Sequence, residues 1–145
     1  MWLVSLGAYG VSSLMVLWTV LNNKNKKNRI WQLLIFIIIY GLGYLLIDAM
    51  KINIGRPRPF SSLSNVILFG YLPTDLSFPS GHTFIAFLTA VLFKKKWLWF
   101  FAAAVGFSRI YLGLHYPIDV TFGAIFGIIY GLAVQKLPSE LRFKN

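Results

Sequence analysis

The sequence predicts an all-α membrane protein, a polytopic bundle of about five transmembrane helices that forms a single domain over residues 1–145. Composition supports this fold class, because 57% of the 145 residues are hydrophobic and only 12% are charged, whereas soluble domains carry about 25% charged residues. The apolar residues also gather in long uncharged runs, and a helix needs about 20 mostly apolar residues to cross a bilayer. A disordered chain is excluded, since such chains are poor in apolar residues.

Five apolar runs define the expected spans, which cover residues 2–21, 30–50, 80–93, 97–114 and 117–136. The first has no basic segment before it and no small-residue cleavage site, so we expect a retained helix rather than a cleaved signal peptide. The second contains the uncharged block 33–40, and the third begins after Pro79. The fourth is apolar except for Arg109, and the fifth carries no charge over 120–135.

Three glycines recur at a spacing of four in the fifth expected span, at Gly123, Gly127 and Gly131. Residues at this spacing lie on one face of a helix. Small residues let two helix backbones approach closely. We therefore expect this face to pack tightly against another helix.

The chain carries 14 Lys and Arg but only four Asp and Glu, and ten of the basic residues predict its orientation. These ten fall on one side of a five-span protein: Lys24, Lys26, Lys27, Arg29, Lys94, Lys95, Lys96, Lys136, Arg142 and Lys144. Excess Lys and Arg in short loops marks the cytoplasmic side. We therefore expect a cytoplasmic C-terminus, an N-terminus outside, and a lipid bilayer rather than a nucleic acid as the partner.

The remaining polar chemistry gathers on the outer side, in loop 51–79 and around 109–119. It comprises Lys51, Arg56, Arg58, Asp75, Arg109, His115 and Asp119, together with Asp48 and His82 at the span ends that border the first loop. Charged groups at the ends of membrane spans are costly and point to function. The sequence therefore places a candidate site at the outer face.

Three motifs hold most of these residues. In chain order they are Lys51 followed after six residues by Arg58-Pro59, the run Pro79-Ser80-Gly81-His82, and Ser108-Arg109 followed by His115 and Asp119. Together they resemble the signature of the type 2 phosphatidic acid phosphatase (PAP2) superfamily, and every signature position is matched. The resemblance covers 51–119, about half of the chain, and implies a small bacterial membrane lipid phosphatase.

The residue types also suit phosphate binding on chemical grounds. Lys51, Arg58 and Arg109 supply permanent charge, and an Arg guanidinium can bond two phosphate oxygens at once. Ser80 and Gly81 stand at a helix start, where free backbone N–H groups favour an anion. The Ser80 hydroxyl is either a further donor or a helix cap. Gly81 leaves room for phosphate to approach the backbone.

The two histidines and one carboxylate suit phosphoryl transfer. His115 and Asp119 are four residues apart with Pro117 at the first helical position, so Asp119 can fix the tautomer of His115 and leave its other nitrogen as nucleophile. His82 is expected across the phosphate, as general acid for the leaving oxygen and then as base for water. The resemblance implies the same roles, with a phosphohistidine on His115.

Neither a metal nor another cofactor is expected. Phosphatases that use divalent metals need clustered carboxylates, whereas Asp48, Asp75 and Asp119 are scattered along the chain. The chain also has no cysteine. The resemblance implies the same metal independence.

Three outer residues have alternative interpretations. Lys51 lies one helical turn from Asp48, so an ion pair between them can replace or accompany phosphate binding. Arg56 lies outside the minimal signature, where it contacts a lipid headgroup, the phosphate or only solvent. Asp75 is expected to be a loop residue rather than a catalyst.

The sequence thus predicts a lipid phosphatase of the bacterial inner membrane that cleaves a phosphomonoester or a pyrophosphate. The resemblance supplies four candidate substrates: undecaprenyl pyrophosphate, lipid A 1-phosphate, phosphatidylglycerol phosphate and phosphatidic acid. We expect the lipid to enter sideways from the outer leaflet, beside an interfacial wall formed by the apolar run 66–71. A lipid phosphotransferase and a lipid-binding membrane protein without catalysis are the alternatives.

Overall fold

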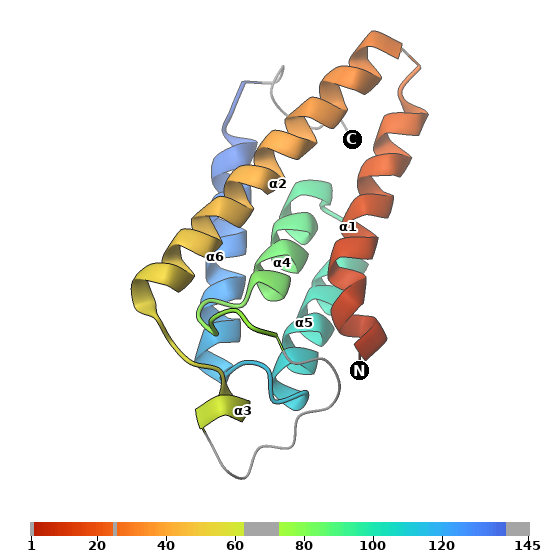
Figure 1. The fold of residues 1–145 in the computed structure, drawn as a ribbon. Coiled ribbons are helices and arrows are strands. Elements are labelled where there is room, and N and C mark those ends of the chain that lie inside the picture. Colours follow the sequence, from red (N-terminus) through yellow and green to blue (C-terminus); the bar gives the residue numbers. More distant parts are fainter. Residues whose placement is uncertain (1, 25, 63–72, 139–145) are drawn as a thin grey trace.

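The computed structural model describes residues 2–24, 26–62 and 73–138, and every regular element in these ranges is a helix. In chain order the helices are α1 (Trp2–Asn22), α2 (Lys26–Ile54), α3 (Pro59–Ser62), α4 (Gly81–Phe93), α5 (Lys96–Tyr111) and α6 (Pro117–Gln135). The long helices alternate in direction (Figure 1). The starts of α1, α4 and α6 therefore lie toward the same end of the bundle as the ends of α2 and α5, and α3 lies at that end too.

The five long helices lie where the apolar runs predict them, with two differences at helix ends. α2 extends beyond the expected 30–50 in both directions and stops before Gly55, whose φ of 65° is left-handed. The Gly55 N–H donates to the Lys51 carbonyl at 2.9 Å, which is a common way for a helix to end at glycine. α5 ends at Tyr111 rather than at 114, because the chain turns at Gly113 with a φ of 69°.

α6 packs against α4 through the face formed by Gly123, Gly127 and Gly131. A Cβ atom at Gly123 would lie 2.6 Å from the Ser80 carbonyl oxygen, and one at Gly127 would lie 2.5 Å from the carbonyl oxygen of Phe84. Only glycine permits such an approach, so the predicted tight contact is present. The Ser80 N–H also donates to the Asp119 carbonyl at 3.0 Å, which fixes the start of α4 beside the start of α6.

α4 is the central helix of the bundle, since ten of its 13 residues are buried. Its Phe84, Leu88 and Phe93 side chains belong to an apolar core that also includes Ile39 of α2 and Val16 of α1. Between helices that face lipid, close packing of such side chains is a main favourable contribution, because lipid tails are as apolar as the side chains themselves. The core ends where α4 begins, and polar residues gather there.

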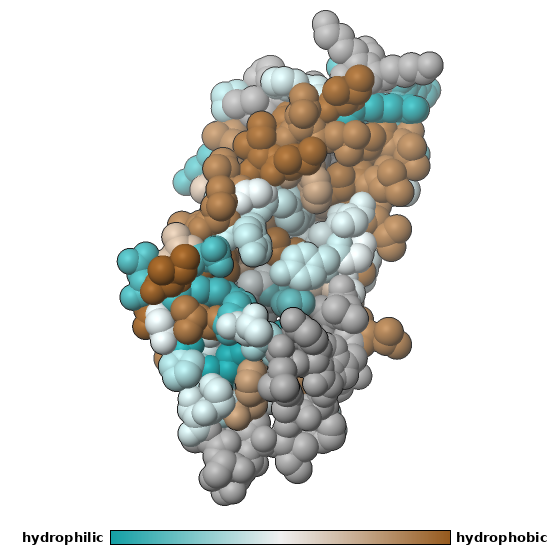
Figure 2. Space-filling model, in the orientation of Figure 1, coloured by the Kyte–Doolittle hydropathy of each residue, from teal (hydrophilic) through white to brown (hydrophobic). Residues whose placement is uncertain are grey.

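Many large apolar side chains on the long helices are exposed. Figure 2 shows hydrophobic side chains along α2 and a polar patch where α2 ends. Among the described residues, the segments Asn28–Ser62 and Pro117–Gln135 are long and apolar enough to cross a membrane, and Gly81–Phe93 is a shorter apolar helix. An exposed apolar exterior of this size is what a lipid-facing protein requires. The apolar run 66–71, expected beside the site, lies outside the described residues.

Candidate active site

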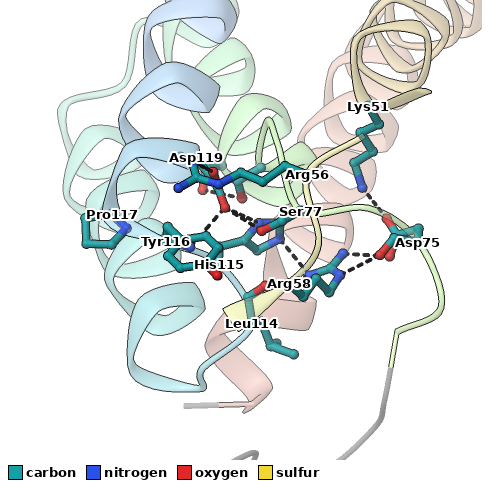
Figure 3. Close-up of polar contacts among 12 residues, drawn as sticks. Lys51, Arg56, Arg58, Asp75, Ser77, Leu114, His115, Tyr116, Pro117 and Asp119 are labelled. Carbon is teal, nitrogen blue, oxygen red and sulfur yellow. Dashed lines mark hydrogen bonds and ion pairs between the residues drawn. The ribbon is translucent and has the colours of Figure 1, made fainter. Parts of the chain in front are cut away.

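Of the predicted site residues, Figure 3 shows Lys51, Arg58, His115 and Asp119 together at the end of the bundle where α4 and α6 begin. Gly55 ends α2 directly after the turn that carries Lys51, and the chain then folds back so that Arg58 lies near the same end. The Arg56 carbonyl accepts the Ser77 N–H at 2.8 Å. This bond fixes the segment after α2 against the segment that leads into α4.

The turn between α5 and α6 positions the third motif. The Arg109 carbonyl accepts N–H groups from Leu114 at 3.1 Å and from His115 at 3.3 Å, which closes the turn at the end of α5. Pro117 is the first residue of α6, as expected. Asp119 follows in the first turn, where its Oδ2 accepts the Tyr116 N–H at 2.9 Å.

His115 points one ring nitrogen toward Asp119 and the other toward Arg58. Its Nδ1 lies 3.7 Å from Asp119 Oδ2, which is longer than a hydrogen bond, and its Nε2 lies 3.1 Å from Arg58 Nη1. Because a guanidinium can only donate, Nε2 is the acceptor. The proton of the neutral ring therefore lies on Nδ1, on the side of Asp119, and Nε2 carries the lone pair.

The surroundings of His115 favour its neutral form. The side chain is only 1% exposed, and this burial lowers the pKa of His115 from 6.5 to about 4. Asp119 opposes the shift, and the positive charges of Arg58, Arg109 and Lys51 add to it. A neutral ring with its lone pair on Nε2 is chemically able to act as a nucleophile near pH 7, once that lone pair is released from the Arg58 hydrogen bond.

The Asp119 side chain is 0% exposed, and both of its carboxylate oxygens accept hydrogen bonds. Its Oδ1 accepts from Arg56 Nη1 at 2.9 Å, and its Oδ2 accepts from Ser77 Oγ at 2.5 Å. The Arg56 guanidinium carbon also lies 4.2 Å from the centre of the Tyr116 ring. Arg56 therefore contacts Asp119 and Tyr116 in the structure. The sequence suggested a lipid headgroup, the phosphate or only solvent, and none of these interpretations includes the observed contacts.

Asp75 lies in a loop, as expected, but it bridges two cations of the first motif. Lys51 Nζ donates to Asp75 Oδ2, and Arg58 Nη2 donates to Oδ1 at 2.6 Å. Partial burial alone would raise the pKa of Asp75, but the Lys51 hydrogen bond and the charge of Arg58 hold this pKa below its usual value. Asp75, rather than Asp48 one helical turn away, is thus the ion-pair partner of Lys51.

These groups surround a cavity of about 230 Å³. Its walls are Tyr9, Tyr44, Ile47, Asp48, Lys51, Arg58, Asp75, Gly81, His82, Phe84, Ile85 and His115. His82 packs edge-on against Tyr9, with ring centroids 4.7 Å apart. A Cβ atom at Gly81 would meet only a methyl group of Ile47, at 3.7 Å, so packing does not require glycine there.

Two predicted phosphate ligands lie outside the cavity wall. Ser80 is buried, and its hydroxyl shares a hydrogen bond of 2.9 Å with Thr83 Oγ1. It makes no side-chain cap of α4, so the capping alternative was wrong. Arg109 is buried in the last turn of α5 and is not among the residues that line the cavity.

Sequence reasoning missed Ser77 altogether and found no partner for Arg56 or Asp75. Ser77 precedes the second motif by two residues, and only the folded chain shows that it donates to Asp119.

Among the described residues, no group of three His, Asp or Glu side chains is arranged to hold a metal ion. Metal independence stays a prediction.

The chain resembles known proteins over most of its length. The family described as the PAP2 superfamily matches residues 31–142. The bacitracin transport permease protein BcrC of Bacillus licheniformis is 37% identical over 136 residues, which are 90% of this chain and 65% of that protein. An undecaprenyl-diphosphatase of Sulfolobus acidocaldarius is 33% identical over 111 residues, which are 72% of this chain and 52% of that protein.

A solved structure also resembles this chain. The crystal structure of Aquifex aeolicus LpxE matches with a TM-score of 0.63 and 28% identity, covering 88% of this chain and 86% of that one. The chain therefore spans most of that structure but less than two thirds of the length of the two curated relatives, 65% and 52%.

Proposed function

We propose, from the premise that this chain belongs to the PAP2 superfamily, that it is an integral membrane enzyme that hydrolyses a phosphate ester or pyrophosphate of a lipid. The observation that carries the proposal is the lone pair on Nε2 of neutral His115, which accepts a hydrogen bond from the buried Arg58 at 3.1 Å in the wall of a cavity that also contains His82. A nucleophile, a fixed positive charge and a second histidine are the groups that phosphoryl transfer through histidine requires.

The phosphate is proposed to bind where Asp75 now bridges Lys51 and Arg58. A carboxylate and a phosphate both present oxygens to these donors, and a dianion gains more from two cations than a monoanion does. The start of α4 supports the same position, because the first N–H groups of a helix have no intrahelical partner and favour an anion. Gly81 lines the cavity at this point and has no side chain in the way.

The proposed reaction has two steps. His115 Nε2 attacks the terminal phosphorus while the bond to the leaving oxygen breaks, which belongs to the lipid alcohol in a monoester and to the lipid monophosphate in a pyrophosphate. His82 in its protonated form gives its proton to that oxygen. Water then attacks the phosphohistidine, His82 takes a proton from it, and inorganic phosphate leaves with His115 neutral again. Asp119, near Nδ1, stabilises the positive charge that the ring carries between the two steps.

We place the cavity end of the bundle on the periplasmic side of the inner membrane and the C-terminus in the cytoplasm. The five long helices then serve as five spans. Support comes from the charge pattern, since the exposed Lys24, Lys94 and Lys136 lie at or beyond the ends of α1, α4 and α6 that point away from the cavity. Basic residues in short segments favour the cytoplasmic side.

A lipid pyrophosphate is proposed as the leading substrate class. Support comes from a relative whose name is undecaprenyl-diphosphatase. The position of the cavity at the end of an apolar bundle, where the headgroup of a lipid in the outer leaflet would lie, supports a lipid substrate of any of the four kinds. Phosphatidylglycerol phosphate, lipid A 1-phosphate and phosphatidic acid are the competing candidates.

The test is a side-by-side assay of the purified chain in detergent with excess chelator. The substrates are undecaprenyl pyrophosphate, the three competing lipids and a water-soluble aryl phosphate, and the readout is free phosphate. We expect lipid hydrolysis in the presence of chelator, fastest with the pyrophosphate, and its loss in a folded His115→Ala variant. Hydrolysis of the soluble phosphate alone would reject a lipid substrate. A phosphorylated acceptor without free phosphate would indicate a phosphotransferase.

A further inference from the structure

We propose that Arg56 is a positioning residue, which holds the Asp119 carboxylate in place for His115 and balances its charge from the side away from the phosphate. The inference rests on the proposed function and deepens it. It adds to the site a residue that lies between the signature positions Lys51 and Arg58 but is not one of them.

The contact between Arg56 and Asp119 is direct and sheltered. Arg56 Nη1 lies 2.9 Å from Asp119 Oδ1, and the carboxylate is 0% exposed whereas the arginine side chain is 35% exposed. Ser77 and the Tyr116 N–H bond the other oxygen, Oδ2, whereas Arg56 bonds Oδ1. The two oxygens are thus fixed separately, and this sets the rotation of the carboxylate that faces His115 Nδ1.

Arg56 is itself held on two sides. Its guanidinium stacks over the Tyr116 ring at 4.2 Å, a distance at which a cation is attracted to an aromatic face. Its carbonyl accepts the Ser77 N–H at 2.8 Å. Arg56, Ser77 and Tyr116 therefore form one frame around Asp119, with both the side chain and the backbone of Arg56 taking part.

Arg56 differs from the other cations near His115 in where its charge lies. The charged and titratable groups around His115 and its cavity come from every packed element: Tyr9 from α1, Tyr44, Asp48 and Lys51 from α2, Arg58 and Asp75 from the connecting segments, His82 from α4, Arg109 from α5 and Asp119 from α6. A bound phosphate would neutralise the cations that it contacts. The buried Asp119 would then favour a proton on His115, and a protonated ring has no lone pair with which to attack phosphorus.

Arg56 prevents this protonation of His115. It does not line the cavity, so a phosphate bound there does not neutralise its charge. It stays with Asp119 whether or not phosphate is bound, so the carboxylate keeps a balancing charge throughout the reaction. Removal of an arginine that pairs with a buried carboxylate leaves an uncompensated charge, which is costly. Part of that cost would be relieved when His115 gains a proton, and the pKa of His115 would rise.

The test uses the fact that the chain has only two histidines, His82 and His115. Protein labelled with ¹⁵N-histidine, in detergent micelles, gives ring signals that report both tautomer and titration, and a His82→Ala sample assigns them. In the wild-type protein we expect His115 to carry its proton on Nδ1 and to titrate near pH 4. The titration is repeated with saturating inorganic phosphate.

In Arg56→Gln we expect the titration midpoint of His115 to rise by about one pH unit, a tenfold gain in proton affinity, with a larger rise when phosphate is bound. Arg56→Lys keeps the charge and should restore most of the wild-type midpoint. Lys96→Gln, an exposed lysine at the other end of the bundle, removes the same charge and should leave the midpoint unchanged.

An unchanged His115 midpoint in folded Arg56→Gln would overturn the inference. If that variant does not fold, Tyr116→Leu removes only the ring beneath the guanidinium and should shift the midpoint in the same direction by less. Kinetics separate a headgroup contact, which would raise KM, from positioning, which lowers kcat with little change in KM. A wild-type protein that hydrolyses no lipid phosphate would reject the proposed function instead, because the titration needs no turnover.

Discussion

Arg58 and Asp75 form an ion pair in the cavity, with Nη2 of Arg58 2.6 Å from Oδ1 of Asp75. A second bond, from Arg58 Nε to the Asp75 carbonyl oxygen at 2.9 Å, fixes the guanidinium in the same direction. Lys51 completes the arrangement at the other carboxylate oxygen. The protein's own carboxylate therefore occupies the donors that we assign to phosphate.

Asp75→Asn is expected to strengthen phosphate binding. A substrate must displace the wild-type carboxylate, whereas a neutral amide competes less for Lys51 and Arg58. Because the Asp75 side chain is 49% exposed, its pairs are worth about 1 kcal/mol, and we expect KM and the inhibition constant of inorganic phosphate to fall about fivefold. Steady-state kinetics at pH 7 measure both. A higher KM would mean instead that Asp75 orients the two cations for the substrate.

Gly81→Ala is expected to weaken substrate binding without harming the fold. The new methyl group would meet only Ile47, at 3.7 Å, yet it would project beside the backbone that we assign to phosphate. Loss of one hydrogen bond to a charged group costs about 1.5 kcal/mol, so kcat/KM should fall at least about tenfold. Gly41→Ala, at a position with nothing within 4 Å, is the matched control. Equal activity in the two variants would show that the phosphate binds elsewhere.

Gly127→Ala should destabilise the bundle rather than the chemistry. Its Cβ would lie 2.5 Å from the Phe84 carbonyl oxygen, and a backbone atom of a central helix has little room to move. Overpacking of this kind costs about 1–3 kcal/mol. Thermal unfolding in detergent should show a clear loss for Gly127→Ala and none for Gly10→Ala, which meets nothing within 4 Å. An equal midpoint for both would mean that α4 and α6 can separate at no cost.

The features that the sequence predicted best depend on residues that are close together along the chain. The all-helical fold follows from uncharged runs, and the proximity of His115 to Asp119 follows from a spacing of one helical turn. The glycine face of α6 was visible for the same reason, since the period of a helix places its three members in one row. The family resemblance is confirmed by the match over residues 31–142.

The partners of Arg56 and Asp75 depend on long-range folding, and spacing could not provide them. Spacing offered Lys51 only Asp48, within its own helix, whereas its observed partner is 24 residues away. Arg56 and Asp119 are 63 residues apart and meet because α6 starts beside the segment after α2. Which loop folds over which helix end is decided by packing and by single bonds such as that from the Ser77 N–H to the Arg56 carbonyl.

The burial of neutral His115 should make the stability of the protein depend on pH. Its pKa is about 4 in the folded chain and near 6.5 in an unfolded one, so between these values the unfolded state binds more protons. The free energy of unfolding then rises with pH through this window. The contribution is complete above about pH 6.5 and is lost as the pH falls to about 4. A shift of this size corresponds to about 3 kcal/mol.

His115→Asn tests this linkage, because asparagine does not titrate. Unfolding is followed in detergent from pH 7.5 to pH 4, and the difference between wild type and variant isolates the contribution of His115 from that of other groups. We expect the wild-type protein to lose stability more steeply as the pH falls. Parallel curves would mean that the folded protein accepts a proton on His115 as readily as the unfolded chain does. The ring would then be largely protonated below pH 6.5, and the proposed nucleophile would be unavailable there.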